Sequence, residues 1–163
     1  MINMNGGMIM GLEIEKKYLI KKIPDNLSEY ECHHMIQGYL NTSPVVRVRK
    51  EDDNYYLTYK GGGMLSRVEY NLPLNEQAFY HLLEKADGNI ISKQRYHIPY
   101  ILDSKNYIIE LDIFDAPFAP LILAEVEFDT ENDANDFVPP EWFDNDVTFD
   151  PAYHNSNLSK KQF

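Results

Sequence analysis

Charged and apolar residues alternate with a period of two at several points along the chain. Successive side chains of a β-strand point to opposite faces, so Glu13, Glu15 and Lys17 would share one face of a strand, and Ile14 and Tyr18 the other. Five more pairs place charged residues at positions i and i+2, usually around an apolar residue: Arg47/Arg49, Arg67/Glu69, Lys93/Arg95, Glu110/Asp112 and Glu125/Glu127. The pattern predicts a mainly β protein with one strongly charged sheet face.

Turn and capping signals divide the chain into about eight strands and a few helices. The clearest helix is expected over residues 75–86, where Asn75 can cap the first turn and Gly88 follows the end. Shorter helices are expected over 25–35, 130–137 and 157–162, and strands near 13–19, 37–40, 45–50, 55–60, 65–72, 90–100, 106–114 and 121–129. We interpret residues 1–10 as a disordered leader and 11–163 as a single domain.

The charged face contains equal numbers of acids and bases. The acids are Glu13, Glu15, Glu69, Glu110, Asp112, Glu125 and Glu127, and the bases are Lys17, Arg47, Arg49, Lys60, Arg67, Lys93 and Arg95. Alternating charge usually marks a solvated sheet face. Here the like-charged neighbours would repel each other unless a ligand lay between them, and a balanced set suits an enclosed space, because an uncompensated buried charge costs several kcal/mol. The balance favours a barrel with a charged interior and helices packed outside.

Composition excludes several classes of partner. The net charge of −11 disfavours nucleic acid and anionic membrane surfaces. No stretch approaches the roughly 20 apolar residues that span a bilayer, and residues 1–11 do not resemble a signal peptide. The single cysteine, Cys32, cannot form an internal disulfide and fits a reducing, cytoplasmic compartment. His33 and His34, expected in the helix over 25–35, are most simply explained by surface or packing roles.

The two signs of charge predict a phosphate ligand held together with a metal ion. Basic residues inside a barrel suit a polyanion, and arginine binds phosphate oxygens through two parallel hydrogen bonds. Paired carboxylates suit a hard divalent cation such as Mg²⁺ or Mn²⁺. Such an ion would neutralise charge during attack on phosphorus.

The motif Glu13-x-Glu15-x-Lys17 resembles the ExExK signature of the CYTH superfamily, the triphosphate tunnel metalloenzymes. Further segments match this superfamily in order: Gln37-Gly38-Tyr39-Leu40, Val46-Arg47-Val48-Arg49, Tyr56 to Gly61, Arg67-Val68-Glu69, Lys93-Gln94-Arg95, Ala124-Glu125-Val126-Glu127 and the tail from Val147 to Leu158. The resemblance implies an α+β, mainly β fold: an eight-stranded antiparallel closed barrel that binds triphosphate and a divalent metal in its tunnel. It also implies a triphosphate-containing small molecule as partner, and homodimers are common in similar proteins.

The resemblance also implies roles for single residues. Metal ligands would be Glu13, Glu15, Glu125 and Glu127, supported by Glu69, Glu110 and Asp112. Triphosphate ligands would be Lys17, Arg47, Arg49, Lys60, Arg67, Lys93 and Arg95, and the catalytic residues Lys17, Glu15 and Glu127. The chain departs from the superfamily pattern at residues 115–120, which lack the usual glycines, and at Asp146, where glutamate is common.

Three functions stay open on the sequence. The preferred one is metal-dependent hydrolysis of inorganic triphosphate or of an organic triphosphate. The second is a class IV-type adenylate cyclase, which makes cyclic AMP and pyrophosphate from ATP; the absence of a histidine just before Glu13 weakens it. The third is a non-catalytic module that binds polyphosphate or nucleotide, although such a module would not need both acid pairs.

Overall fold

Strands make up most of the chain, as the alternating pattern predicts. The computed structural model describes the backbone of residues 9–163 and side chains from residue 11 onward. The strands are β1 (Ile9–Ile20), β2 (Glu31–Thr42), β3 (Val45–Glu51), β4 (Asn54–Lys60), β5 (Ser66–Leu74), β6 (Asp87–Leu102), β7 (Lys105–Phe114), β8 (Ile122–Glu127) and β9 (Phe143–Asp146). The helices are α1 (Glu76–Leu83), α2 (Glu131–Asp136) and α3 (Asn155–Leu158), with 3₁₀ turns η1 (Leu27–Glu29) and η2 (Pro151–Tyr153). None of the helices in this described part is long and apolar enough to cross a membrane.

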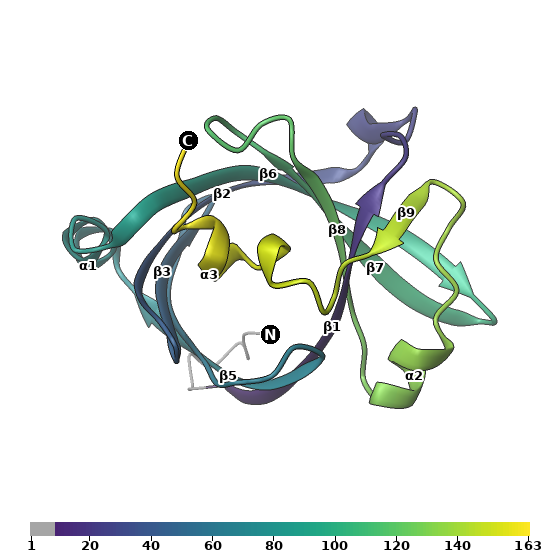
Figure 1. Cartoon of the computed structure of the whole chain (residues 1–163), viewed down its shortest axis with the longest axis horizontal. Coiled ribbons are helices and arrows are strands. Elements are labelled where there is room, and N and C mark those ends of the chain that lie inside the picture. The colour runs from purple at the N-terminus through teal and green to yellow at the C-terminus, as the bar shows by residue number, and fades with distance from the viewer. Residues whose placement is uncertain (1–8) are drawn as a thin grey trace.

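Eight strands form a closed antiparallel barrel, which confirms the expected fold class (Figure 1). Their order around the ring is β5-β4-β3-β2-β6-β7-β8-β1, and β1 pairs back to β5 through residues such as Leu12 opposite Val68. The short β9 pairs with the end of β1 beside the barrel. In this ring β3 and β8 are four strands apart in either direction, so they face each other across the barrel, and so do β1 and β2.

The apolar face of the sheet points outward and is covered on one side by α2 and β9. Ile14, Tyr18 and Val126 are buried there with Phe137 and Phe143. The Tyr18 ring lies 4.8 Å from the Phe143 ring and 6.2 Å from the Phe137 ring, centroid to centroid. This cover removes from water the apolar surface that a barrel with a charged interior must place on its outside.

Helix α1 covers the opposite side of the barrel (Figure 1), and its position depends on a glycine of β2. A Cβ atom on Gly38 would lie 2.8 Å from both Ala86 Cβ and Leu83 Cδ1, so only glycine lets the helix end approach this closely. The helix begins as predicted, because the Asn75 side chain accepts a hydrogen bond from the Ala78 backbone N–H at 2.8 Å.

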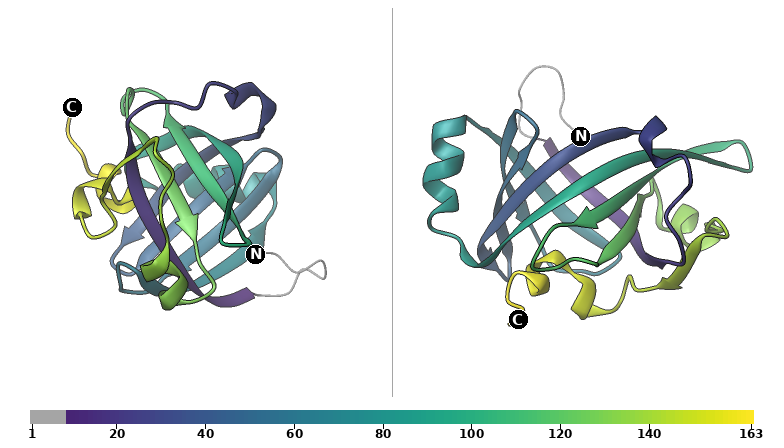
Figure 2. Two further views of the ribbon diagram at one scale, coloured as in Figure 1. Left: turned by 90° about the vertical axis from the view of Figure 1, so that its right-hand side faces the viewer. Right: turned by 90° about the horizontal axis from the view of Figure 1, so that it is seen from above.

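The C-terminal tail lies across one end of the barrel, and both views of Figure 2 place it there. Leu158 of α3 and Val147 pack into an apolar cluster with Tyr39, Val45 and Phe114 at this end. Helix α3 therefore fixes the tail over the barrel interior and brings polar tail residues next to it.

Several sequence expectations need correction. The helix over 25–35 is wrong: only η1 forms, and β2 already starts at Glu31, because residues 31–37 pair with the long strand β6. The final helix is α3 rather than 157–162, α1 ends at Leu83 rather than 86, and β9 was not expected. Of the expected leader, residues 1–8 lie outside the described residues, whereas residues 9 and 10 begin β1.

Candidate active site

The barrel encloses a cavity of about 430 Å³. Thirteen of the fourteen charged residues assigned to the charged face lie on its wall, and the exception is Asp112. These side chains come from every strand of the barrel except β2. Residues two positions apart in a strand point to the same face, so both members of each charged pair point toward the interior.

Three carboxylates converge where β1 and β8 meet. Glu15 lies opposite Glu127 in the antiparallel register, and Glu13 is two residues earlier on β1. One oxygen from each of Glu13, Glu15 and Glu127 lies within 4.8 Å of the other two. We call these three residues the acid trio. Carboxylate oxygens are the ligands that Mg²⁺ and Mn²⁺ prefer, so the trio fits a hard divalent cation.

Burial and mutual repulsion disfavour the ionised form of two carboxylates in the acid trio. Burial, followed by the nearby Glu13 and Glu125, raises the pKa of Glu15 from 4.5 to about 7. Burial and the neighbouring Glu110 and Glu13 raise the pKa of Glu127 to about 7 as well, although the residue keeps an exposed part. Glu15 and Glu127 thus resist ionisation next to the other carboxylates, and a bound cation would relieve that repulsion.

Glu125 and Glu110, both expected to help hold metal, are engaged by cations instead. Glu125 receives Lys17 Nζ at 3.0 Å and Arg95 Nη2 at 3.1 Å. Glu110 accepts Arg95 Nη1 at 2.6 Å. Burial opposes the charge on Glu125, but Lys17 and Arg95 outweigh it and hold its pKa well below the usual range. Glu125 is therefore ionised and neutralised by protein groups.

Glu69 is likewise paired, with Lys60 at 3.2 Å. Burial opposes its ionisation, yet Lys60 and the hydrogen bonds around the carboxylate bring its pKa below the ordinary value. Lys60 also contacts Glu13 at 2.7 Å, and Arg67 Nε reaches Glu13 at 3.2 Å. Glu13 thus links the acid trio to the basic residues of β4 and β5.

Asp112 lies behind the cavity wall and is completely buried. Its two oxygens accept hydrogen bonds from Arg95 Nε at 2.6 Å and Arg95 Nη2 at 2.7 Å, and it also contacts Lys93 Nζ. Burial raises the pKa of Asp112, but Arg95 and Lys93 together lower it further than burial raises it. This position lets Asp112 orient two wall cations, whereas Lys93 and Arg95 separate it from the cavity.

Across the barrel from β8, the basic residues of β3 have few partners. Among residues 11–163, Arg47 forms no ion pair, and Arg49 forms one, with Glu51 at 3.3 Å. The Nε atoms of both arginines are buried without a hydrogen-bond partner. Burial and then the like charges of Arg47 and Arg95 lower the pKa of Arg49. We call Arg47 and Arg49 the arginine pair; it has unused donors and repelling charges, so an anion would stabilise it.

Sequence reasoning missed several uncharged residues on the wall. Gln37 of β2 is only 1% exposed, and both polar atoms of its amide lack a partner in the described chain. Lys17 Nζ donates to the Tyr153 carbonyl at 3.3 Å, and its backbone N–H donates to Thr148 Oγ1 at 3.0 Å, so the tail contacts a residue with an expected catalytic role. Gln37, Thr148 and Asn155 belong to segments that match the superfamily, which is the signal that could have indicated them.

Comparisons with known proteins agree with this geometry. A family model described as the CYTH domain matches residues 11–147. An inorganic triphosphatase of Nitrosomonas europaea is 37% identical over 152 residues, which cover 90% of this chain and 96% of the relative. One from Acetivibrio thermocellus is 35% identical over 162 residues, which cover 94% and 97%. The crystal structure of the inorganic triphosphatase NE1496 superimposes with a TM-score of 0.67 at 33% identity, and the match covers 92% of this chain and 95% of that one.

Proposed function

The chain belongs to the CYTH domain family, and we propose that it is a divalent-metal-dependent hydrolase of inorganic triphosphate. The observation that carries the proposal is the opposition of the acid trio and the arginine pair across one closed barrel. The relatives described as inorganic triphosphatases, which match nearly the whole chain, support the choice of substrate.

The arginine pair would bind the phosphate oxygens. The unpaired donors of Arg47 and Arg49, together with the unpaired amide of Gln37, supply hydrogen bonds that the protein itself does not satisfy. A hydrogen bond to a charged group contributes about 1.5–3 kcal/mol, and a guanidinium can make two to one phosphate. Triphosphate would therefore satisfy buried donors and relieve the repulsion between the two arginines.

Glu13, Glu15 and Glu127 would hold the metal, with Mg²⁺ and Mn²⁺ as the candidates. When bound, the ion would neutralise charge on the phosphate oxygens during attack on phosphorus. Glu69, Glu110, Asp112 and Glu125 support the site from a distance, because they fix the lysines and arginines of the wall.

Lys17 lies on β1 two residues after Glu15, beside the acid trio. Burial alone would lower its pKa, but the carboxylates of Glu125 and Glu15 raise it above the ordinary value, so the ammonium stays charged. A charged Lys17 would stabilise negative charge that develops on the phosphate oxygens. Water, oriented by a carboxylate of the wall, would attack a terminal phosphorus, and pyrophosphate would leave.

The test is release of orthophosphate from tripolyphosphate by the purified chain. Activity is expected with Mg²⁺ or Mn²⁺ and is expected to disappear in EDTA. Glu15→Gln and Glu127→Gln should abolish turnover, whereas Glu84→Gln, which neutralises an exposed carboxylate at the end of α1, should not. No orthophosphate with either ion between pH 6 and pH 10 would refute the proposal.

A panel of other triphosphates separates the remaining possibilities. Formation of cyclic AMP and pyrophosphate from ATP would indicate a cyclase, and tight triphosphate binding without turnover would indicate a binding module. The preference between Mg²⁺ and Mn²⁺, a homodimer, a cytoplasmic location and the lack of nucleic-acid or membrane partners stay predictions. Metal titration of activity, sedimentation, cell fractionation and binding assays would test them.

A further inference from the structure

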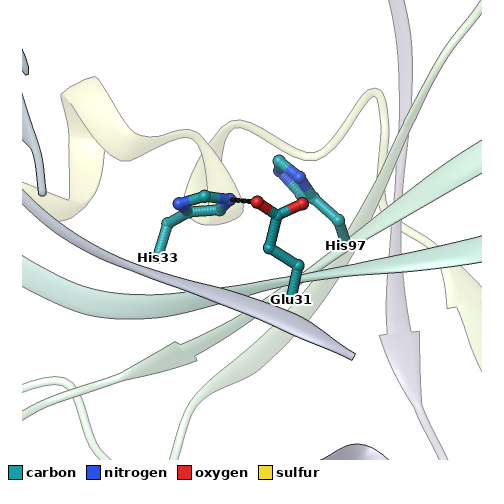
Figure 3. Close-up of side chains that lie close together, drawn as sticks. All are labelled: Glu31, His33 and His97. Atoms are coloured by element: carbon teal, nitrogen blue, oxygen red, sulfur yellow. Dashed lines mark ion pairs between the residues drawn. The ribbon is translucent and has the colours of Figure 1, made fainter. Parts of the chain in front are cut away.

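A second group of metal-ligating side chains lies on the wall opposite the acid trio. Glu31, His33 and His97 each offer one ligand atom, and these atoms lie within 4.8 Å of one another (Figure 3). His33 Nε2 is 3.3 Å from Glu31 Oε1, and the centroids of the two imidazole rings are 4.8 Å apart. We call these three residues the histidine cluster.

The histidine cluster occupies the end of the barrel away from the tail. In the antiparallel register of β2 and β6, Glu31 lies opposite His97, and His33 lies opposite Arg95 of the cavity wall. Tyr39, which packs near α3, lies eight residues after Glu31 on β2, or roughly 26 Å along the strand. His97 also lines the cavity. The cluster therefore lies at the end of the barrel away from the tail, and none of its residues belongs to the acid trio.

A carboxylate outside the cluster fixes the orientation of His33. His33 Nδ1 is 2.6 Å from Asp52 Oδ2, and Asp52 Oδ1 accepts the His34 backbone N–H at 2.9 Å. The Asp52 backbone N–H in turn donates to the His34 carbonyl at 2.9 Å. A proton on Nδ1, shared with Asp52, leaves the Nε2 lone pair directed toward Glu31. Histidines that bind metal commonly have such a carboxylate on their other nitrogen.

We propose that Glu31, His33 and His97 bind a zinc-class divalent ion, namely Zn²⁺, Co²⁺ or Ni²⁺, with Asp52 orienting His33. Imidazole nitrogens prefer these ions, whereas an all-carboxylate group such as the acid trio prefers Mg²⁺ or Mn²⁺. Two imidazoles and one carboxylate supply three ligands and leave a fourth position for water or an anion. The histidine cluster and the acid trio thus favour different metals by their ligand chemistry.

A proton offers the competing explanation of this geometry. A doubly protonated His33 could bridge Asp52 and Glu31 by itself, and that arrangement gives His97 no part. Loss of the His97 imidazole therefore separates the two arrangements, because only a metal site needs it.

The experiment is a titration of the full chain with Co²⁺, followed by visible absorption, and with Zn²⁺ in competition with a chromophoric chelator. Excess Mg²⁺ is present throughout to occupy the acid trio. One zinc-class site is expected in the unaltered chain. Asp52→Asn, which removes an outer partner, should weaken Zn²⁺ affinity by about 10- to 100-fold. His33→Ala and His97→Ala, which each remove a ligand, should weaken Zn²⁺ affinity by more than that.

Two variants serve as matched controls, and circular dichroism checks that every variant folds. His34→Ala removes an exposed imidazole from the same strand, and Glu15→Gln removes a carboxylate from the acid trio; neither should change Zn²⁺ affinity. Unchanged affinity in His97→Ala, or loss of the site in Glu15→Gln, would overturn the proposal. Because no triphosphate is used, this outcome is independent of the proposed hydrolase activity.

Discussion

Glu15→Gln should make the metal-free protein more stable at alkaline pH. In the folded chain the pKa of Glu15 is about 7, against 4.5 for an ordinary glutamate, mainly because of burial and then the charges of Glu13 and Glu125. The folded state therefore binds more protons than the unfolded state between these two values. Stability must fall as pH rises through this window, and the loss is complete above it. A glutamine, which does not titrate, removes that loss.

The size of the effect follows from the pKa difference. About 2.5 pKa units at about 1.36 kcal/mol each correspond to roughly 3 kcal/mol above pH 8. At pH 5 the same relation leaves only about 1 kcal/mol, because most of the folded protein is then protonated at Glu15. The ion pair lost with Arg67, at 3.6 Å, is weak, and Arg67 retains Glu13 at 3.2 Å. For a chain of this length the alkaline gain corresponds to a rise in melting temperature of about 6–12 °C.

Urea unfolding in EDTA, at pH 5 and pH 8.5, measures the two differences. Glu84→Gln on the surface is the control and should change stability by less than about 0.5 kcal/mol at either pH. Mg²⁺ at about 1,000 times its dissociation constant should reverse the order, since it stabilises a binding-competent chain by about 4.1 kcal/mol. The reasoning is wrong if Glu15→Gln is no more stable than the unaltered chain at pH 8.5, or if its gain is equal at both pH values.

Three further substitutions test other parts of the molecule. Arg47→Ala should raise KM for tripolyphosphate about 10- to 100-fold with a smaller effect on kcat, while Lys50→Ala on the outer side of β3 should leave both unchanged; equal KM values would place the phosphate elsewhere. Asp112→Asn should lower the free energy of unfolding by about 3–5 kcal/mol in chemical denaturation, because the buried Lys93 loses its counter-charge and Arg95 loses one of three; a change under 1 kcal/mol would contradict its anchoring role. Gly88→Ala should lower the melting temperature, since Gly88 has φ +69° and a Cβ there would lie 2.1 Å from the Ser159 carbonyl oxygen; an unchanged melting temperature would show that the tail can shift freely.

The period-two pattern predicted the wall of the site because strand geometry alone decides which side chains share a face. Glu13, Glu15 and Lys17 lie on the cavity wall for this reason, whereas Ile14 and Tyr18 are buried outside. The like-charged neighbours on that face also indicated an enclosed interior with a ligand, because such charges repel each other when nothing lies between them.

Depth and long-range pairing could not be predicted in this way. Asp112 shares its inward face with Glu110, but Arg95 and Lys93 cover it, and no local pattern indicates which inward residue will be covered. Similarly, a capping signal at Asp25 favoured a helix over 25–35. The strand formed instead because β6 extends far enough to pair with residues 31–37, a contact between segments about 60 positions apart. The histidine cluster depends on that pairing, so it could not be predicted from the sequence either.

The balance of seven acids and seven bases indicated an enclosed space, but the pairing among them locates the chemistry. Glu125 neutralises Lys17, Glu69 neutralises Lys60, and Asp112 neutralises Lys93. After these pairs are formed, Glu15 and Glu127 of the acid trio on β1 and β8, and the arginine pair on β3, keep few partners, and β8 faces β3 across the barrel. Equal totals would be compatible with complete internal neutralisation, which leaves no need for a ligand. The separation of the remaining charges is what favours the binding of one cation and one polyanion together in the same cavity.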